Sequence, residues 1–442
     1  MNFEQNSPVF DGAMTRLAWG PITLPYEYTG PRDEYLACRR SAWLGIALNT
    51  TPIYDVTGPD AVKLFNQTCV NKDFSLMKVG NSKHALICND KGQMNADGVI
   101  MKIGENLYRT YWMAPVLQYC VETSGLDVQG SYVTDEFFLQ LDGPKSLEIL
   151  ETAFGINFHD LKFAHNKTVD WQGAELIVHR LGMSGALAYE IHGKQQDFNR
   201  VYPRLREVLF QYDGRLQGFR NYCTVNHTTA GYPNQNIHFI YPYYDSEPEL
   251  AEWTKANHIA ANTAIAGSAS DDIQNAYATP YDVGWGYLVN FNHEFRGKAA
   301  LQQLKQNSPY KMVTLEWNAD DVADVFKSQF EGKREDMYEP IEYFSGFDDM
   351  SQGMATHIDY VMSNGEKVGI ASGRTYAYYE NRMISLAKIK PELAALDNEV
   401  EVLWGGPNYK QKLIRAKVAP FPYYNGEYRN EHFDVSAIPE LA

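Results

Sequence analysis

The sequence predicts an α+β protein with more than one domain. Its 442 residues exceed what one ordinary hydrophobic core accommodates, and 44% of them are hydrophobic. Apolar residues follow helical spacing between positions 198 and 209, an alternating meander spans positions 83–113, and strand runs follow position 312. Helices and antiparallel strands in separate stretches are typical of α+β architecture.

The expected elements follow one another along the chain. The first 40 residues are rich in turn formers, and a helical pattern at 34–43 completes what we expect to be an arm lying over the body. Turns at 89–92 and 104–106 divide the meander into three strands, because their residues tolerate positive φ. Strands at 368–376, 384–388 and 400–404 make up most of the tail, and an acidic stretch at 331–352 is expected to be an exposed insertion.

The amino-acid composition restricts which binding partners and which cellular compartment we expect for this protein. Lys and Arg together number 39 against 55 Asp and Glu, so a net charge of −16 argues against nucleic acid. The five cysteines form no C-x-x-C pair, which predicts a reduced, cytoplasmic setting. The sequence shows neither an export signal nor a run of apolar residues long enough to span a membrane, so we expect a soluble protein.

The stretch R-L-G-M-S-G-A-L-A-Y-E-I at positions 180–191 is the organising motif of the chain. Gly182, Ser184 and Gly185 permit tight turns and close approach of the backbone. Glu190 alternates with apolar Tyr189 and Ile191 in a predicted strand, so its carboxylate faces the other way. Such a carboxylate is either solvated or aimed into a cleft.

The spacing R-x-G-x-x-G-x-x-x-Y-E-I resembles the folate-binding signature of the glycine-cleavage T-protein family. The resemblance implies that Glu190 holds the aminopyrimidine edge of tetrahydrofolate, a task for which two parallel N–H donors suit a carboxylate. It further implies cofactor contacts from Tyr189, from Trp285 in a second motif at 284–298, and from Arg374 after the S-G step at 372–373. The implied fold is a T-protein-like cloverleaf with a folate-binding region of two lobes at 1–306 and a C-terminal β-barrel at 307–442.

The segment G-Q-M-N-A-D at 92–97 stands where the family carries two acids near the one-carbon centre. Asp97 survives there, whereas Ala96 replaces the other acid. The loss counts against aminomethyl transfer, for which an acid at this site is usual in the family. An ordinary aspartate leaving a turn is the alternative interpretation of Asp97.

The segment at 218–245 carries the candidate acid catalyst. His227 and His238 lack a nearby third ligand, so no metal site is predicted. A-D-G at 96–98 and V-N-H-T at 225–228 are most similar to tetrahydrofolate-dependent O-demethylases of methoxylated aromatics. Methyl transfer from an aryl ether releases a phenolate, and a tyrosine suits a leaving group of that basicity. By similarity we choose Tyr241, with Asp97 as the other catalytic candidate; a simply packed Tyr241 ring is the alternative.

The expected function is therefore O-demethylation of a small methoxylated aromatic, with tetrahydrofolate as methyl acceptor. Transfer of a methylene group, from a methylenedioxyarene or an aminomethyl carrier, and a non-catalytic folate-binding regulator remain open. A neutral substrate is expected because apolar residues replace family arginine and tyrosine positions. The candidate substrate-binding residues are Trp253, Met113, Asn49, Leu24 and Ile22.

Overall fold

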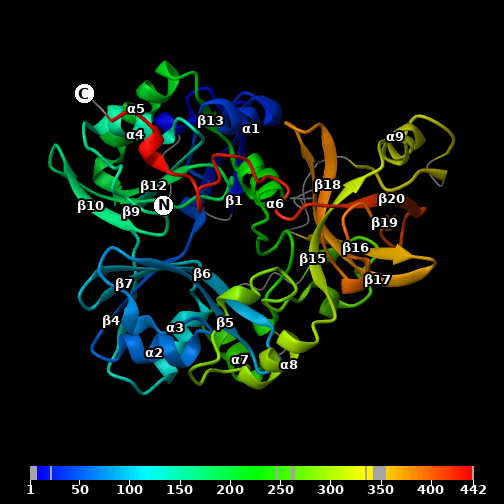
Figure 1. Cartoon of the computed structure of the whole chain (residues 1–442), viewed down its shortest axis with the longest axis horizontal. Coiled ribbons are helices and arrows are strands. Elements are labelled where there is room, and N and C mark those ends of the chain that lie inside the picture. Colours follow the sequence, from blue (N-terminus) through cyan, green and yellow to red (C-terminus); the bar gives the residue numbers. More distant parts are fainter. Residues whose placement is uncertain are drawn as a thin grey trace.

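The computed structural model describes residues 7–19, 22–244, 247–259, 264–333, 336–341 and 355–440. Figure 1 shows three lobes, two built on open sheets and one on a barrel, around a centre where the short helix α6 (His227–Ala230) lies. Most of the insertion expected at 331–352 lies outside the described residues. In the described part of the chain, no helix is long and apolar enough to cross a membrane.

The first lobe contains a six-stranded sheet in the order β10-β11-β12-β9-β3-β13. Helices α1, α4 and α5 pack against it around a core that includes the buried rings of Trp43 and Tyr202. The strand bounds are β3 Trp43–Gly45, β9 Glu136–Asp142, β10 Asn166–Trp171, β11 Ala174–His179, β12 Ala188–Lys194 and β13 Arg215–Gln217; the helix bounds are α1 Pro31–Arg40, α4 Ser146–Phe154 and α5 Phe198–Gln211. A hairpin of β1 Thr15–Trp19 and β2 Ile22–Glu27 precedes α1.

The helix predicted at 34–43 begins and ends three residues earlier than expected. Pro31 starts α1, since proline suits the first turn, where no backbone N–H donor is needed. The Glu34 carboxylate accepts hydrogen bonds from the N–H groups of Tyr28 and Thr29, which fixes the chain entering the helix. Trp43 lies in β3 instead, where it pairs with Asp142. This segment therefore belongs to the lobe itself.

The second lobe contains the predicted meander. Its sheet has the order β5-β6-β7-β4-β8, and β5, β6 and β7 confirm the three meander strands. The bounds are β4 Ile53–Thr57, β5 Ser82–Cys88, β6 Met94–Gly104, β7 Leu107–Tyr111 and β8 Gln129–Tyr132, with α2 Ala61–Thr68, α3 Val116–Thr123, α7 Pro248–Ala256 and α8 Lys298–Gln306 nearby.

The third lobe is a closed barrel, which confirms the predicted C-terminal β-barrel. Six strands follow the order β16-β17-β18-β15-β20-β19, and pairing of β16 with β19 closes the ring. Their bounds are β15 Lys311–Trp317, β16 Thr356–Ser363, β17 Glu366–Ala377, β18 Arg382–Ile389, β19 Glu399–Trp404 and β20 Lys412–Ala419; β14 Ile265–Ala266 adds to β16, and α9 Ala319–Ser328 contacts β20. The chain after β20 returns to the first lobe (Figure 1), where Ala186 and Arg429 form a β-bridge.

Candidate functional site

A cavity of about 580 Å³ is lined by residues of the two open-sheet lobes. This volume is in the range of small-molecule sites. Aromatic rings form much of its wall: Trp112, Phe138, Phe163, Tyr222, Trp285 and Tyr287. Among the predicted site residues, Glu190, Asp97, Tyr241 and Trp285 line this cavity. Residues predicted for cofactor binding and residues predicted for proton transfer therefore line the same cavity.

The organising motif forms a tight turn, and Gly182 and Met183 of this turn line the cavity. Gly185 has a φ of +77°, and the Ser184 N–H donates to Asp142 at 3.2 Å. The Arg180 guanidinium donates to the carbonyls of Asn430 and Phe433, so it fastens the returning C-terminal segment to the turn. The motif's small residues and its arginine thus position the strand that carries Glu190.

Gly182 is required by this packing. A Cβ at this position would lie 2.2 Å from the Ala188 Cβ and 2.8 Å from the Asp142 Oδ2. We predict that Gly182→Ala lowers the free energy of unfolding by about 1–3 kcal/mol, the usual cost of overpacking. Urea denaturation checks the loss, with Gly406→Ala as control because the nearest atom there is 3.5 Å away. Equal stability of the two variants would contradict the packing argument.

Glu190 is 4% exposed and lies between two histidines. It pairs across the strands with His179, whose Nδ1 is 2.8 Å from Oε2, and the His192 Nε2 is 3.7 Å from the same oxygen. Burial opposes ionisation, but the hydrogen bonds and charges of the histidines hold the pKa of Glu190 below its usual value. The described contacts use Oε2, so Oε1 remains for a ligand with N–H donors.

The two histidines beside Glu190 were not among the residues predicted from the sequence. Ligand atoms of His179, Glu190 and His192 lie within 4.8 Å of one another, a spacing that a metal ion could use. The cluster also has a sufficient explanation without metal, because His192 Nδ1 is 3.1 Å from the Glu136 carboxylate and its pKa is raised, against burial, by Glu136 and Glu190. The alternation His192–Glu190 along one strand face, opposite His179, is the signal that could have found it.

Asp97 and Tyr241 form a hydrogen-bonded pair at another wall of the cavity. The Tyr241 hydroxyl donates to Asp97 Oδ1 at 2.5 Å and accepts from the Asp97 N–H at 2.9 Å. Burial, together with the neighbouring carboxylate, raises the pKa of Tyr241 well above its usual value. The tyrosine therefore stays protonated and is held in one orientation.

The remaining predicted residues are not among those that line this cavity. Trp253 on α7 donates through Nε1 to Glu122, and Asn49 donates to the carbonyls of Ile46 and Phe138. Met113 and Leu24 are buried in core clusters, and Ile22 packs against one of them.

Tyr189 points into the core of the first lobe, because it alternates with Glu190 in β12. Arg374 stacks over the Trp404 ring in the barrel at 4.4 Å.

Several lining residues were not foreseen. Trp112 has a φ of +65°, rare for so large a residue, and is 38% exposed at the cavity. Tyr222 and Cys223 lie on a π-helical turn, Asn221–Asn226, a distortion common at functional sites. His227 also lines the cavity, and burial lowers its pKa to about 4.

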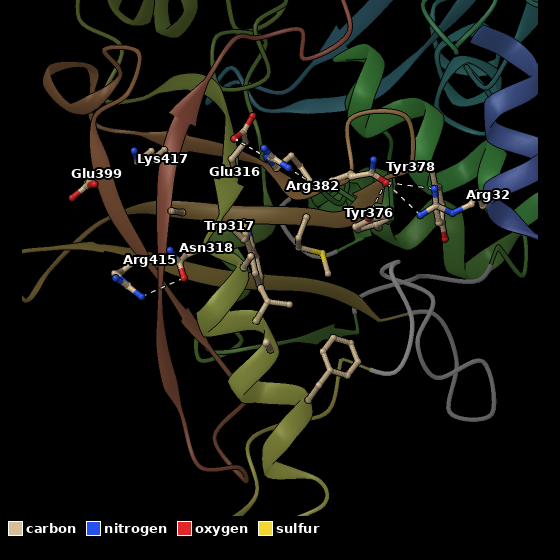
Figure 2. Close-up of a pocket in the computed structure, with 17 residues that line it drawn as sticks. Arg32, Glu316, Trp317, Asn318, Tyr376, Tyr378, Arg382, Glu399, Arg415 and Lys417 are labelled. Carbon is tan, nitrogen blue, oxygen red and sulfur yellow. Dashed lines mark hydrogen bonds and ion pairs between the residues drawn. The ribbon is translucent and has the colours of Figure 1, made fainter. Parts of the chain in front are cut away.

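A second hollow, of about 940 Å³, runs along the barrel beside α9 (Figure 2). It shares no lining residue with the first cavity. Arg32 reaches it from α1 and donates to Asn381, while Arg415 is paired with Asp321. None of the predicted site residues lines this hollow, so the first cavity is the candidate active site.

Comparison with known proteins identifies the class. The profile of the GCVT N-terminal domain matches residues 18–225. The fold resembles the crystal structure of the glycine cleavage system aminomethyltransferase T from Bartonella henselae, with a TM-score of 0.67 at 16% identity over 94% of this chain and 95% of that one. A relative that is 41% identical over 95% of this chain shows that the chain belongs to the T-protein family of tetrahydrofolate-dependent one-carbon transferases.

Three relatives span almost the whole chain. A sesamin methylene transferase from Sinomonas sp. (strain No.22) is 41% identical over 95% of this chain and 94% of its own. A syringate O-demethylase from Sphingobium sp. is 27% identical over 90% of both chains. An aminomethyltransferase from Thermotoga maritima is 22% identical, covering 92% of this chain and 93% of its own. The family thus includes three kinds of one-carbon donor.

Proposed function

We propose that the protein transfers the bridging methylene carbon of a neutral methylenedioxyarene to tetrahydrofolate. The observation that carries this proposal is the 41% identity, over 95% of the chain, to a sesamin methylene transferase. Transfer of a methyl group, the reaction expected from the sequence, is the second candidate. It is favoured by the 27% identity to a syringate O-demethylase.

The cavity residues suit a reduced folate. A pterin offers two adjacent N–H donors, and Glu190 presents a buried carboxylate with one oxygen left for a ligand. Aromatic walls, including Phe138 and Trp285, provide flat apolar surface for the ring system. When bound, tetrahydrofolate supplies the nitrogen nucleophiles that accept the one-carbon unit. Glu190 would fix the orientation of that group in the chamber.

The proton balance suits Tyr241 and Asp97. Moving a methylene group breaks two aryl C–O bonds and forms two C–N bonds, while the two hydrogens lost by nitrogen end on the two catechol oxygens. Each departing oxygen therefore needs a proton when its bond to carbon breaks. Tyr241, held by Asp97 through two hydrogen bonds, is the group that would deliver it.

The charge of the lining argues for a neutral substrate. The lining includes the carboxylates of Asp97, Glu190 and Glu431, whereas its lysines are Lys72 and Lys83. Lys83 donates to the carbonyls of Lys72 and Asp73, and burial lowers its pKa to about 8. A substrate carboxylate would lose hydration near other anions and gain no bidentate arginine.

We therefore predict that 5-methyl-1,3-benzodioxole is a better substrate than 1,3-benzodioxole-5-carboxylate. A penalty of about 1–3 kcal/mol for the uncompensated anion corresponds to roughly 5- to 160-fold in kcat/KM. Steady-state assays with the two arenes at one folate concentration measure this ratio. Preference for the carboxylate would contradict the charge argument.

A panel of neutral arenes tests the proposed function itself. The protein is incubated with tetrahydrofolate and either methylenedioxy- or methoxyarenes, and the folate product is followed by mass. Methylene transfer makes the folate heavier by one carbon atom, and methyl transfer by one CH2 unit. Gain of one carbon with a methylenedioxyarene supports the proposal. A gain seen solely with methoxyarenes would replace it by O-demethylation, and no gain with either class would contradict both.

A further inference from the structure

His84 extends the Tyr241–Asp97 pair into a chain of three groups. The His84 Nε2 is 3.2 Å from Asp97 Oδ2, while Asp97 Oδ1 accepts the Tyr241 hydroxyl. His84 on β5 is diagonal to Asp97 on β6, since Asp97 pairs with Leu86 two residues further on. One carboxylate therefore bridges a phenol and an imidazole.

The three groups run from a buried position toward an accessible one. Tyr241 is 6% exposed, whereas the side chains of Asp97 and His84 are 19% and 31% exposed. The Trp285 ring packs edge-on against the imidazole, with centroids 4.6 Å apart and planes at 83°. All four residues line the cavity. The imidazole is thus held in place and still reaches ligand and water.

After Tyr241 has donated its proton to a departing oxygen, another group has to reprotonate the Tyr241 hydroxyl. A tyrosinate there would be buried beside the Asp97 carboxylate, which burial and charge both disfavour. The proton has to arrive through Asp97, which contacts the hydroxyl. His227 lies near Asp97 but is unsuited, because burial lowers its pKa to about 4 and its Nδ1 is engaged with the Tyr232 carbonyl. His84 is the imidazole that contacts the other carboxylate oxygen of Asp97 directly, at 3.2 Å.

We propose that His84 is the proton carrier of the site, an inference that rests on the proposed function. As a C–O bond of the donor breaks and a C–N bond forms, His84 passes a proton to Asp97, Asp97 to Tyr241, and Tyr241 to the departing phenolate. The proton released from the attacking nitrogen restores His84, directly or through water. Each C–O cleavage uses one such cycle, and no oxidant or reductant is required.

Two substitutions at His84 distinguish a role in proton transfer from a role limited to holding Asp97 in place. Glutamine keeps a donor for Asp97 but cannot carry a proton, and alanine leaves room for added imidazole. We expect kcat to fall about 10²-fold in both His84→Gln and His84→Ala, with KM changed only a few-fold. Imidazole should restore turnover in His84→Ala and leave His84→Gln unchanged. His293→Gln is the control, because His293 contacts the Asn66 carbonyl outside the cavity lining.

A measurement without turnover tests the same chain. With ¹⁵N-labelled histidine, the His84 ring nitrogen signals should shift in Asp97→Asn, while those of His293 should not. Wild-type-like turnover of His84→Gln, failure of imidazole to rescue His84→Ala, or unshifted His84 signals would each overturn the proposal. Failure of the proposed function is distinguishable, since the wild-type protein would then move no carbon to folate.

Discussion

Replacing Glu190 with alanine is expected to weaken tetrahydrofolate binding by about 2–4 kcal/mol, or roughly 30- to 1,000-fold in Kd. Glu190 lines the cavity and is 4% exposed, and the hydrogen bonds and charges of His179 and His192 hold its pKa below the usual value against burial. Alanine removes the acceptor for the pterin N–H donors and leaves those donors unpaired. Isothermal titration with tetrahydrofolate under reducing conditions measures the change.

A buried glutamate elsewhere in the same lobe provides the control. Glu151 is 1% exposed, accepts from the Phe158 N–H and contacts His159, and does not line the cavity. Glu151→Gln should bind the folate as the wild type does, and thermal melting of both variants shows whether the fold is kept. Unchanged affinity in Glu190→Ala would remove Glu190 from the cofactor site.

Replacing Tyr241 with phenylalanine should lower turnover by about 10²–10⁴, the usual contribution of a positioned general acid. The ring packing remains, while the hydroxyl that bonds Asp97 through both Oδ1 and the backbone is lost. Folate and arene affinities should therefore stay within a few-fold. The loss should shrink for donors whose phenols are more acidic, since a better leaving group needs less protonation.

Tyr243→Phe is the matched control, because Tyr243 is equally buried but bonds Tyr244 rather than Asp97. The variant Asp97→Asn shows whether Asp97 or Tyr241 protonates the departing oxygen. If Asp97 alone delivers the proton, the dependence on leaving-group acidity will appear in Asp97→Asn and not in Tyr241→Phe. Undiminished turnover in Tyr241→Phe would exclude the tyrosine from proton transfer.

Local pattern and motif spacing predicted the architecture well. The meander turns and four of the barrel strands follow from alternation and turn residues, and β5–β7, β15, β17, β18 and β19 confirm them, whereas β16 and β20 were not predicted. The start of α1 was wrong by three residues, because it depends on Pro31 and on a side-chain contact made by Glu34. The return of the C-terminal segment to the first lobe, through Arg180 and Asn430, is a contact between distant residues. No local pattern encodes such a contact.

Four of the residues predicted for the site line the cavity, and the role of each stays a prediction. Glu190, Asp97, Tyr241 and Trp285 reach the cavity. Met113 does not: it is buried in the core of the second lobe, while its neighbour Trp112, which has a positive φ, lines the cavity. Backbone geometry of that kind is unusual for tryptophan, so the sequence could not indicate it. His84 was missed because its relation to Asp97 depends on strand register, which appears only once β5 and β6 are paired.

Transfer of isotopically labelled carbon tests the central claim most directly. A neutral methylenedioxyarene carrying ¹³C in its methylene bridge is mixed with the protein and tetrahydrofolate, and carbon NMR follows the label. The account predicts that the label moves to the folate, that an unlabelled catechol forms in equal amount, and that Glu190→Ala slows the transfer. Release of the label as formaldehyde at the same rate without folate, or retention of the label in the arene, would contradict it.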